Sequence, residues 1–438
     1  MIIKYHNYPK VKESEKSHIF SLNTKRYIMG LFRRNKNNNK PLFKQIIDLV
    51  PRWLLNSCIK NHQSDKGCSK YKTYDQLVAL TFGQLNKCLT LSDISTGIGV
   101  CETFIADLGL TQSPARSTMS DGNKNRGWQV FESLYLKLLR HYNGVLSKQH
   151  QSYVIEEIKG HRIKIIDSTT IGLCMSLFDW AKFRTAKGGI KIHTCWDDTL
   201  MLPDMVNITE AKVHDRYGLK QLVFAKGTII IEDRAYFDYG LMASRISAGN
   251  IFVTRIKTNT LYKSSYELDL PDYQDQDILK DEIIQLSSKQ AAKAGIGQEK
   301  LRLVCVYKED ENKVIEIITN QTNWTARTIA DLYKKRWDIE LFFKAIKQNL
   351  QIKTFVGTSE NAVKSQIYVA LICYLLLQLI KRTIAKSTKG FSNFVEKIRI
   401  CLPFYLSLDY VCNQINEGAK RVRVLKQAEL VPKLDLFS

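Results

Sequence analysis

The stretch 332–350 constrains the fold more than any other part of the chain, because two kinds of residue recur along it at helical spacing. Its charged and phenolic residues stand three, four, four and three positions apart, which places them within an arc of roughly 80° on a helix. They are Tyr333, Arg336, Glu340, Lys344 and Lys347. Its apolar residues form a neighbouring stripe that can be buried. They are Leu332, Ile339, Phe343, Ile346 and Leu350.

This pattern predicts a helix whose charged stripe lies at the rim of a core. One carboxylate, that of Glu340, then shares a surface with three cations. Such a surface can hold a phosphate backbone beside an acid that binds a metal ion. The simpler alternative is an ordinary amphipathic helix whose charges are all solvated.

Two aspartates each follow a short run of β-branched residues. Asp167 ends the run 163–167, and Asp233 ends the run 228–233. Both runs predict buried strands with a carboxylate at the end. Together with Glu340 they supply three hard oxygen ligands, of the kind that Mg²⁺ and Mn²⁺ prefer. Two such ions, about 3.5–4 Å apart, can activate an attacking oxygen and stabilise a leaving one. Taken singly, either aspartate is equally well explained as a turn or helix cap.

The combination resembles the bacterial insertion-sequence DDE transposases, in the IS4-like group marked by a Tyr-Arg-Glu-Lys signature. That signature has two residues between Tyr and Arg, three between Arg and Glu, and six between Glu and Lys, and the chain matches all three gaps. The matching residues are Tyr333, Arg336, Glu340 and Lys347. The blocks 233–238, 189–194 and 208–215 resemble other parts of that family's catalytic domain. The resemblance covers residues 40–385.

The resemblance implies a ribonuclease-H-like domain in which Asp167, Asp233 and Glu340 bind two divalent ions, Mg²⁺ or Mn²⁺. It implies a cut-and-paste reaction, with hydrolysis at the ends of the element followed by strand transfer into target DNA. It also implies a homodimer on double-stranded DNA, at the terminal inverted repeats and the target, in the bacterial cytoplasm at the nucleoid. A nuclease of the same fold without strand transfer is one alternative. A DNA-binding protein that has lost catalysis is another.

The same resemblance implies DNA contacts around these acids. Cations and a phenol of the signature would hold backbone phosphates, and the tryptophan within it would stack on an extruded base. One further arginine directly follows the second aspartate, and its role is open. These residues are Tyr333, Arg336, Trp337, Lys344, Lys347 and Arg234.

Composition favours a polyanionic partner, because 65 basic residues against 43 acidic ones leave a net charge of +22. Ribosomal or membrane-surface binding would fit the charge alone.

The ten cysteines form no C-x-x-C pair, which favours reduced thiols in the cytosol over a disulfide frame or a zinc site. No signal peptide is expected, and the longest apolar stretch, 367–380, is shorter than the roughly 20 residues of a membrane span. It predicts a buried helix packed on the catalytic sheet.

The N-terminal third predicts two different segments. Residues 1–40 carry ten Lys and Arg against two Glu, which predicts a disordered basic arm; alternatively, translation starts at Met29. Residues 41–130 predict a helical domain that resembles a helix-turn-helix reader of the element's ends, with a helical bundle bearing basic surface residues as the alternative. The candidate DNA contacts are Arg116, Ser117, Lys124 and Arg126.

From residue 150 the pattern changes to strands, and periodicity alone predicts a mixed α/β fold. Helices are expected after Asp215 and over 239–247. The ribonuclease-H-like assignment of 150–256 and 321–385, with a β-rich insertion at 257–320, comes from the resemblance. Residues 386–438 predict a helical C-terminal region with a basic tail at 420–426. The expected strands are 163–167, 190–196, 204–209, 228–233 and 251–255.

The sequence offers other residues that could be metal ligands at the predicted site. Glu232 and Asp233 point to opposite faces of a strand, so only one of them lines the site. The following Arg-Ala-Tyr favours Asp233, and a shift by one residue would give the role to Glu232. His193 and His214 have no partner at zinc spacing, so neither belongs to the predicted metal set. Asp197 and Asp238 are weaker substitutes for the second aspartate.

Overall fold

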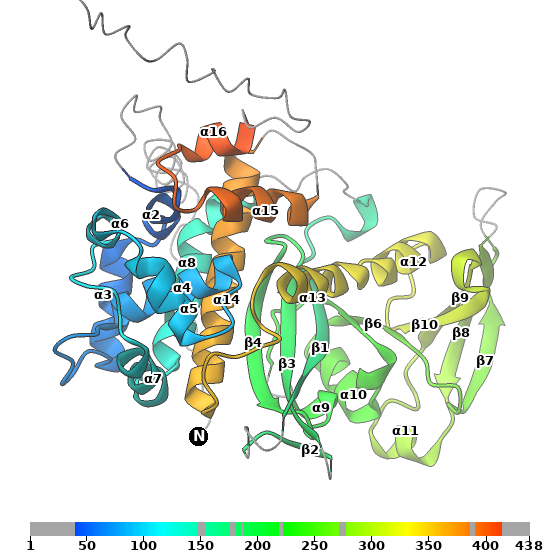
Figure 1. Ribbon diagram of the computed structural model, residues 1–438. Helices are drawn as coiled ribbons and strands as arrows, with labels where there is room; N and C mark the ends of the chain where they lie inside the picture. The colour runs from blue at the N-terminus through cyan, green and yellow to red at the C-terminus, as the bar shows by residue number, and fades with distance from the viewer. Residues whose placement is uncertain are drawn as a thin grey trace, which may run out of the picture.

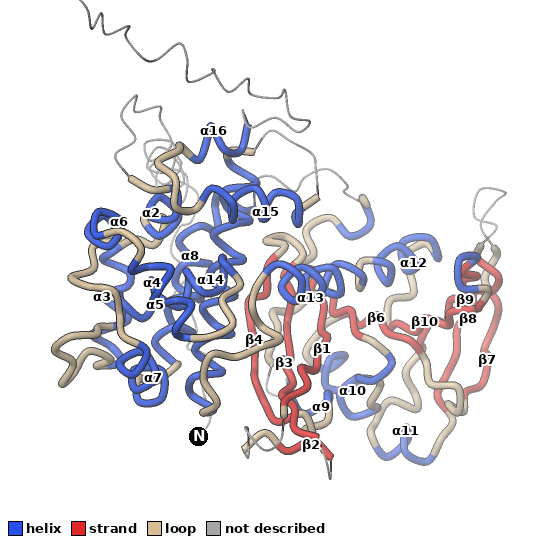
Figure 2. Tube along the Cα trace, viewed as in Figure 1, coloured by secondary structure: helices blue, strands red, loops and turns tan. Residues whose placement is uncertain are grey.

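The computed structural model describes residues 40–147, 155–174, 178, 180–184, 187–218, 222–270, 277–385 and 390–413. A group of helices and a large twisted sheet lie side by side, and one long helix stands between them (Figure 1 and Figure 2). The predicted arm 1–40, apart from its last residue, lies outside the described residues, and so does the predicted basic tail 420–426.

The helical part is built from both ends of the described chain. Two backbone hydrogen bonds join them, from Leu42 N–H to the Phe404 carbonyl at 2.8 Å and from Phe43 N–H to the Leu402 carbonyl at 2.9 Å. The predicted domain 41–130 and the C-terminal region therefore pack as one unit. Its helices are α2 (Leu42–Ile47), α3 (Arg52–His62), α4 (Thr73–Asn86), α5 (Leu91–Gly99), α6 (Glu102–Asp107), α7 (Arg116–Asn125), α8 (Gln129–Leu146), α14 (Glu360–Thr383), α15 (Phe391–Cys401) and α16 (Leu408–Asn413).

Side-chain caps fix where some of these helices begin. Before α5, the Thr90 hydroxyl accepts from Asp93 N–H at 3.1 Å, and the Asp93 carboxylate accepts from Thr90 N–H at 2.9 Å. Before α14, the Ser359 hydroxyl accepts from Ala362 N–H at 3.2 Å. These bonds satisfy backbone donors that a helix start leaves without an intrahelical partner.

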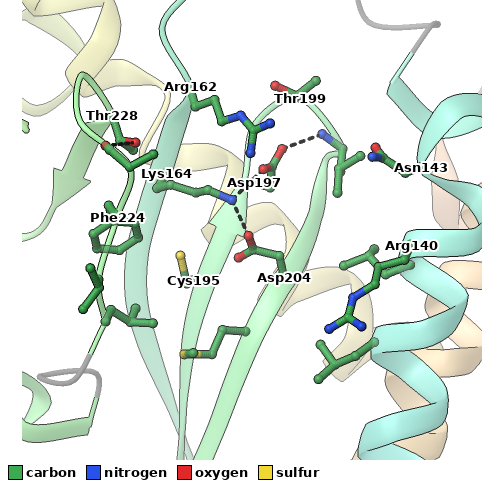
Figure 3. Close-up of a pocket in the computed structure, with 17 residues that line it drawn as sticks. Arg140, Asn143, Arg162, Lys164, Cys195, Asp197, Thr199, Asp204, Phe224 and Thr228 are labelled. Atoms are coloured by element: carbon green, nitrogen blue, oxygen red, sulfur yellow. Dashed lines mark hydrogen bonds and ion pairs between the residues drawn. The ribbon is translucent and has the colours of Figure 1, made fainter. Parts of the chain in front are cut away.

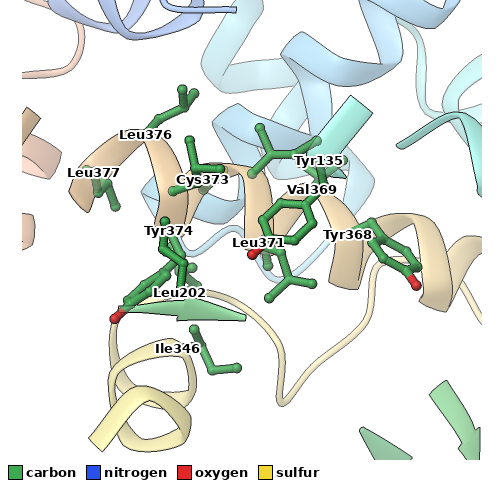
Figure 4. Packing of buried hydrophobic residues seen from close by; sticks show 14 of the residues in the cluster. Tyr135, Leu202, Ile346, Tyr368, Val369, Leu371, Cys373, Tyr374, Leu376 and Leu377 are labelled. Carbon is green, nitrogen blue, oxygen red and sulfur yellow. The ribbon is translucent and has the colours of Figure 1, made fainter. Parts of the chain in front are cut away.

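Helix α14 is the core of the molecule. The Tyr368 hydroxyl donates to the Val206 carbonyl at 3.0 Å, and its ring stacks on Trp128 with centroids 5.4 Å apart. Figure 4 shows its side chains between Tyr135 of α8 and Leu202 of the sheet. Helix α14 is longer than the predicted stretch 367–380. By length and composition alone it could span a membrane, and it is the one helix among the described residues for which this holds. Because 89% of that window is buried inside the protein, α14 is a core helix.

One sheet contains all the described strands. Along it the order is β2-β3-β1-β5-β6-β10-β9-β8-β7, and β4 also pairs with β3. β1 pairs antiparallel with β3 and parallel with β5, which pairs parallel with β6. The strands are β1 (Ile163–Leu173), β2 (Lys182–Arg184), β3 (Lys187–Asp197), β4 (Leu202–Glu210), β5 (Ile229–Glu232), β6 (Ile251–Arg255), β7 (Tyr262–Glu267), β8 (Ile278–Leu286), β9 (Leu301–Lys308) and β10 (Lys313–Thr319).

The five strands predicted between 163 and 255 all form, as β1, β3, β4, β5 and β6. The predicted insertion 257–320 does not form a sheet of its own, because β10 pairs with β6 through Ile318 and Thr254. Its strands extend the same sheet. The helices and 3₁₀ turns around the sheet are η2 (Glu156–Ile158), α9 (Asp215–Gly218), η3 (Arg234–Tyr236), α10 (Tyr239–Ser247), α11 (Lys289–Lys293), η4 (Glu309–Glu311), α12 (Ala326–Lys334) and α13 (Trp337–Asn349).

The centre of the sheet, around β5, is buried on both of its faces, whereas the edge strand β7 is exposed. Successive side chains of a strand point to opposite faces, so Ile231 of β5 packs in the same core as Ile339 of α13, whereas Ile230 packs with Tyr236. We call the first side the α13 face. Because both faces are covered, β5 is apolar throughout except at its last residue.

Candidate active site

Asp167 and Asp233 stand where the parallel pairing of β1 and β5 ends. The last paired residues are Ile166 and Glu232, and each aspartate follows directly. Two neighbouring parallel strands in register end at the same edge, so their next side chains lie close together. Beyond this point β1 continues with β3 as its pairing partner among the described strands.

The signature residues lie in two consecutive helices and not in the single helix that their spacing predicts. A tight turn joins α12 to α13, with Lys335 N–H donating to the Leu332 carbonyl at 3.1 Å and Arg336 N–H donating to the Tyr333 carbonyl at 3.0 Å. Such i→i−3 bonds shorten the local repeat relative to an α-helix. Tyr333 therefore belongs to the end of α12, Arg336 is the N-cap residue before α13, and Glu340 and Lys347 lie within α13.

Helix α13 is fixed on the sheet by its apolar stripe. The Phe342 ring packs 5.3 Å from that of Trp196 in β3, centroid to centroid. Helix α13 also packs against β1, and Glu340 lies in its first turn. Because β1 runs on to Leu173, Asp167 lies within this strand and not at its end as predicted. The predicted buried stripe is confirmed at Leu332, Ile339, Phe343, Ile346 and Leu350, all of which are buried.

Two carboxylates from distant parts of the chain lie around one guanidinium, and a third is near enough to affect its pKa. Arg336 Nη1 lies 2.6 Å from Glu340 Oε1 and 3.8 Å from Asp167 Oδ2. Burial disfavours the charge of Arg336, but Tyr333, Glu340 and Asp233 outweigh it and raise its pKa. The geometry thus brings Asp167 and Glu340 to the same guanidinium, and the convergence of all three acids around metal ions stays a prediction.

The pKa of Asp167 is raised mainly by its burial. Burial is the main cause that raises its pKa, to about 7, and the carboxylates of Asp233 and Glu340 act in the same direction. Arg336 and the Ser168 N–H, which donates to Asp167 Oδ1 at 2.7 Å, oppose the shift. The pKa stays raised because burial outweighs both of these stabilising contacts.

These residues fit a divalent cation by chemistry and not yet by arrangement. All three donors are hard carboxylate oxygens, and an added cation would favour the charged form of Asp167, which burial and the neighbouring acids disfavour. Within the described residues, however, no group of three His, Cys, Asp or Glu side chains is close enough to hold an ion as it stands. The Arg336 guanidinium is the cation among the acids here, so an ion would have to displace it.

Other signature residues surround this cluster. Lys347 Nζ donates to Thr169 Oγ1 at 2.5 Å, on the same face of β1 as Asp167. Trp337 keeps 46% of its surface exposed, with Lys308 Nζ 4.9 Å from its ring centroid. Lys344 and Arg234 are exposed.

Tyr333 differs from its prediction as an accessible phosphate contact. The side chain is buried, and its hydroxyl has no hydrogen-bond partner among the described residues. Burial raises its pKa to about 12. A buried hydroxyl without a partner is uncommon in folded proteins and can serve a group that enters the site.

The neighbouring acid Glu232 is committed elsewhere. Its Oε1 lies 2.6 Å from Arg245 Nη2 of α10, on the face opposite α13, and both side chains are buried. This supports the choice of Asp233. The weaker substitutes are also engaged, since Asp197 pairs with Lys164 at 2.6 Å and Asp238 caps α10.

The predicted DNA contacts of the helical part divide into two groups. Arg116, Ser117 and Lys124 are exposed on α7. Arg126 is only 6% exposed, and its guanidinium donates inward to Gln76 Oε1 at 2.7 Å and the Tyr71 carbonyl at 2.5 Å. The prediction of Arg126 as a DNA contact was wrong, because its charge serves the packing of this domain.

His193 is a packed residue, as its exclusion from the metal set implied. It is buried, its Nε2 lies 2.9 Å from Thr209 Oγ1, and burial lowers its pKa to about 4. The sequence reasoning missed its surroundings, where Ser168, Lys191 and Asp215 form a polar cluster. The sequence predicts a strand over 204–209 and a helix after Asp215, but no functional role for this segment.

A cavity of about 480 Å³ lies apart from this site, between α8 and the sheet. Figure 3 shows Lys164 in it, between Asp197 and Asp204, with Arg140 of α8 across the space. Lys164 precedes Asp167 by three residues and so points to the opposite face of β1. The cavity is therefore not part of the acid cluster.

Comparison with known proteins decides the family. The family described as the transposase DDE domain matches residues 158–376, half of the chain. The chain belongs to the DDE transposases. The match includes Asp167, Asp233 and Glu340. A second family, a domain of unknown function (DUF4372), matches residues 38–111 of the transposase.

Curated relatives carry the same description. A probable transposase for insertion sequence element IS5377 from Geobacillus stearothermophilus is 30% identical over 57% of this chain and 64% of its own. The putative transposase y4zB of Sinorhizobium fredii is 30% identical over 66% of this chain and 78% of its own. A putative transposase for insertion sequence element IS4SA from Synechocystis is 26% identical over 60% and 71%. The transposase thus aligns with slightly under two thirds of the first relative's length, and it is of the insertion-sequence kind.

Proposed function

We propose that this transposase cleaves DNA at the ends of its own element and joins the freed 3′ ends to target DNA, with Asp167, Asp233 and Glu340 holding two divalent ions. The observation that carries the proposal is that Asp167 and Glu340 lie within 3.8 Å of the Arg336 guanidinium, with Asp233 near enough to raise its pKa. When bound, Mg²⁺ or Mn²⁺ supplies the charge and Lewis acidity for in-line phosphoryl transfer, first to water and then to a 3′-hydroxyl.

The side chains around the acids then hold DNA. Arg336 suits two-point contact with a phosphate once it leaves the carboxylates, whereas Lys344 and Lys347 act as point charges. Lys347 is already beside the site, through its bond to Thr169. The open face of Trp337 is suited to stacking on a base.

The finer family and fold assignments are also proposals. We place the transposase in the IS4-like group because Tyr333, Arg336, Glu340 and Lys347 keep the spacing of its signature. We assign a ribonuclease-H-like catalytic core to strands β4-β3-β1-β5-β6. Three antiparallel strands followed by two parallel ones, with helices on both faces, support that assignment.

Recognition of the element's ends is assigned to the helical part. Three polar residues of α7 are exposed and can reach DNA, whereas Arg126 is buried. They are Arg116, Ser117 and Lys124. The excess of basic residues supports binding of double-stranded DNA. We propose that a homodimer assembles on that DNA, at the nucleoid of a bacterial cell.

The test uses purified full-length protein, fragments that carry the element's own ends, and Mg²⁺. Wild-type protein should give nicks and joined products, and Glu340→Gln should bind the fragments without cutting them. Glu360→Gln is the matched control, because Glu360 is an exposed acid on α14 that pairs with Lys364 at 2.7 Å, away from the site. Cleavage by Glu340→Gln at the wild-type rate would contradict the proposal. Nicks without joined products would favour the nuclease alternative.

A further inference from the structure

A polar cluster packs behind the middle of β1, on the face opposite α13. The Ser168 hydroxyl donates to Asp215 Oδ1 at 2.5 Å. Lys191 Nζ lies 3.1 Å from the same oxygen and also donates to the Val213 carbonyl at 2.9 Å. Both Lys191 and Asp215 are largely buried, so their ion pair is weakly screened by solvent.

Asp215 is held in place by the short helix that it begins. Gly218, at the other end of α9, lies so close to His193 that a Cβ there would come within 2.1 Å of Nδ1. Asn207 Nδ2 donates to the Gly218 carbonyl at 2.8 Å. A residue larger than glycine would push α9 away from the sheet, so this position fixes the distance from Asp215 to β1.

Ser168 connects this cluster to the acids on the other face. Its side chain points toward Asp215, while its backbone N–H donates to Asp167 Oδ1 at 2.7 Å. At this point β1 has lost its parallel neighbour, because the pairing with β5 ends at Ile166. The bond to Asp215 therefore restrains a stretch of strand that is paired along one edge.

We infer that Asp215, assisted by Lys191, is a positioning residue: from behind the sheet it fixes Ser168 and, through the Ser168 N–H, the carboxylate of Asp167. The inference rests on the proposed function of Asp167 as a metal ligand. Residues that orient metal ligands typically change metal affinity or activity by about 10- to 100-fold when mutated. Neither Asp215 nor Lys191 touches the reacting atoms.

The experiment compares Asp215→Asn, Ser168→Ala and the double variant of the full-length protein. Mn²⁺ affinity is measured from the free ion's electron paramagnetic resonance signal, without DNA or turnover. Each single variant should weaken Mn²⁺ binding by about tenfold. The double variant should bind Mn²⁺ no more weakly than the single variant with the lower affinity, because both changes break the same connection. Ser168→Ala keeps the Lys191–Asp215 pair, so it also serves if Asp215→Asn folds poorly.

Asp204→Asn separates positioning from general destabilisation of the sheet. Asp204 lies in β4 and pairs with Lys164, much as Asp215 pairs with Lys191 (Figure 3). It has no hydrogen bond to residue 168. This variant should lower the urea midpoint of unfolding and leave Mn²⁺ affinity at the wild-type value.

Two results would overturn the inference. One is wild-type Mn²⁺ affinity in both Asp215→Asn and Ser168→Ala. The other is an equal loss of affinity in Asp204→Asn. Asp167→Asn distinguishes failure of this inference from failure of the proposed function. If Asp167→Asn still binds Mn²⁺ and cleaves DNA as the wild type does, the metal-ligand role of Asp167 is itself refuted.

Discussion

Arg336 and Glu340 form an ion pair across one turn, with 2.6 Å between Nη1 and Oε1, at the centre of the acid cluster. The guanidinium thus supplies the positive charge that the three carboxylates share. This pairing explains how the acids can converge without forming a ready set of metal ligands. It also means that a divalent ion and Arg336 compete for the same oxygens.

Removing this competitor should strengthen metal binding. Arg336→Met is expected to lower the free energy of unfolding in chelator, because the carboxylates lose their counter-ion, and to gain more stability from Mg²⁺ than the wild type gains. A tenfold rise in affinity adds about 1.4 kcal/mol at saturating ion. Urea unfolding with and without Mg²⁺ measures both effects. Arg234→Met, at an exposed arginine beside Asp233, is the control, and equal Mg²⁺ stabilisation in both variants would contradict the competition.

Stability should depend on pH through Asp167. Burial is the main cause that raises its pKa to about 7, whereas an unfolded aspartate titrates near pH 4. The folded protein therefore holds this proton more tightly, and the free energy of unfolding should fall as pH rises from about 4 to about 7, then level off. In chelator, Asp167→Asn should show a shallower fall over that window. Identical slopes in urea titrations of the two proteins would exclude the effect.

Sequence patterns predicted the parts of this site that repeat a local rule. Asp167 and Asp233 follow β-branched runs, and those runs form paired strands. The junction at Lys335 was not predictable, because helical spacing continues through it while the backbone tightens into i→i−3 bonds. The competition by Arg336 was also hidden, since spacing alone does not show which way a long side chain turns.

Arg126 shows a second limit of the sequence. Its neighbours on α7 are exposed and polar, so its charge looked available, but Tyr71 and Gln76 from a separate segment surround it. Asp215 was missed for a related reason. Its partner Ser168 is 47 residues away in the chain, and the pair meets only because α9 folds back behind β1.

Arg126 should matter for stability and Arg116 for DNA. Arg126→Ala leaves buried acceptors without their donors and is expected to cost about 3 kcal/mol of unfolding free energy. Arg116→Ala, at an exposed position, should change stability by less than about 0.5 kcal/mol and weaken binding to the element's ends. Urea unfolding and fluorescence anisotropy with end fragments measure the two quantities. The reverse pattern would return Arg126 to the set of DNA contacts.

Lys347 should contribute one phosphate contact. Lys347→Ala is expected to weaken DNA binding and reduce the slope of log affinity against log salt by about one unit. Thr169→Val is the matched control, because it removes the partner of Lys347 Nζ while keeping the charge. Its slope should equal that of the wild type. An unchanged slope in Lys347→Ala would show that this lysine meets no phosphate.

The proposed reaction depends on a pair of divalent ions held by three distant carboxylates. Anomalous diffraction from crystals of the transposase with an element-end fragment and Mn²⁺ tests it most directly. The expected result is two Mn²⁺ peaks about 3.5–4 Å apart, ligated by Asp167, Asp233 and Glu340, with Arg336 turned away from them. Peaks bound elsewhere, or an Arg336 that still bridges the acids in the presence of Mn²⁺ and DNA, would contradict it.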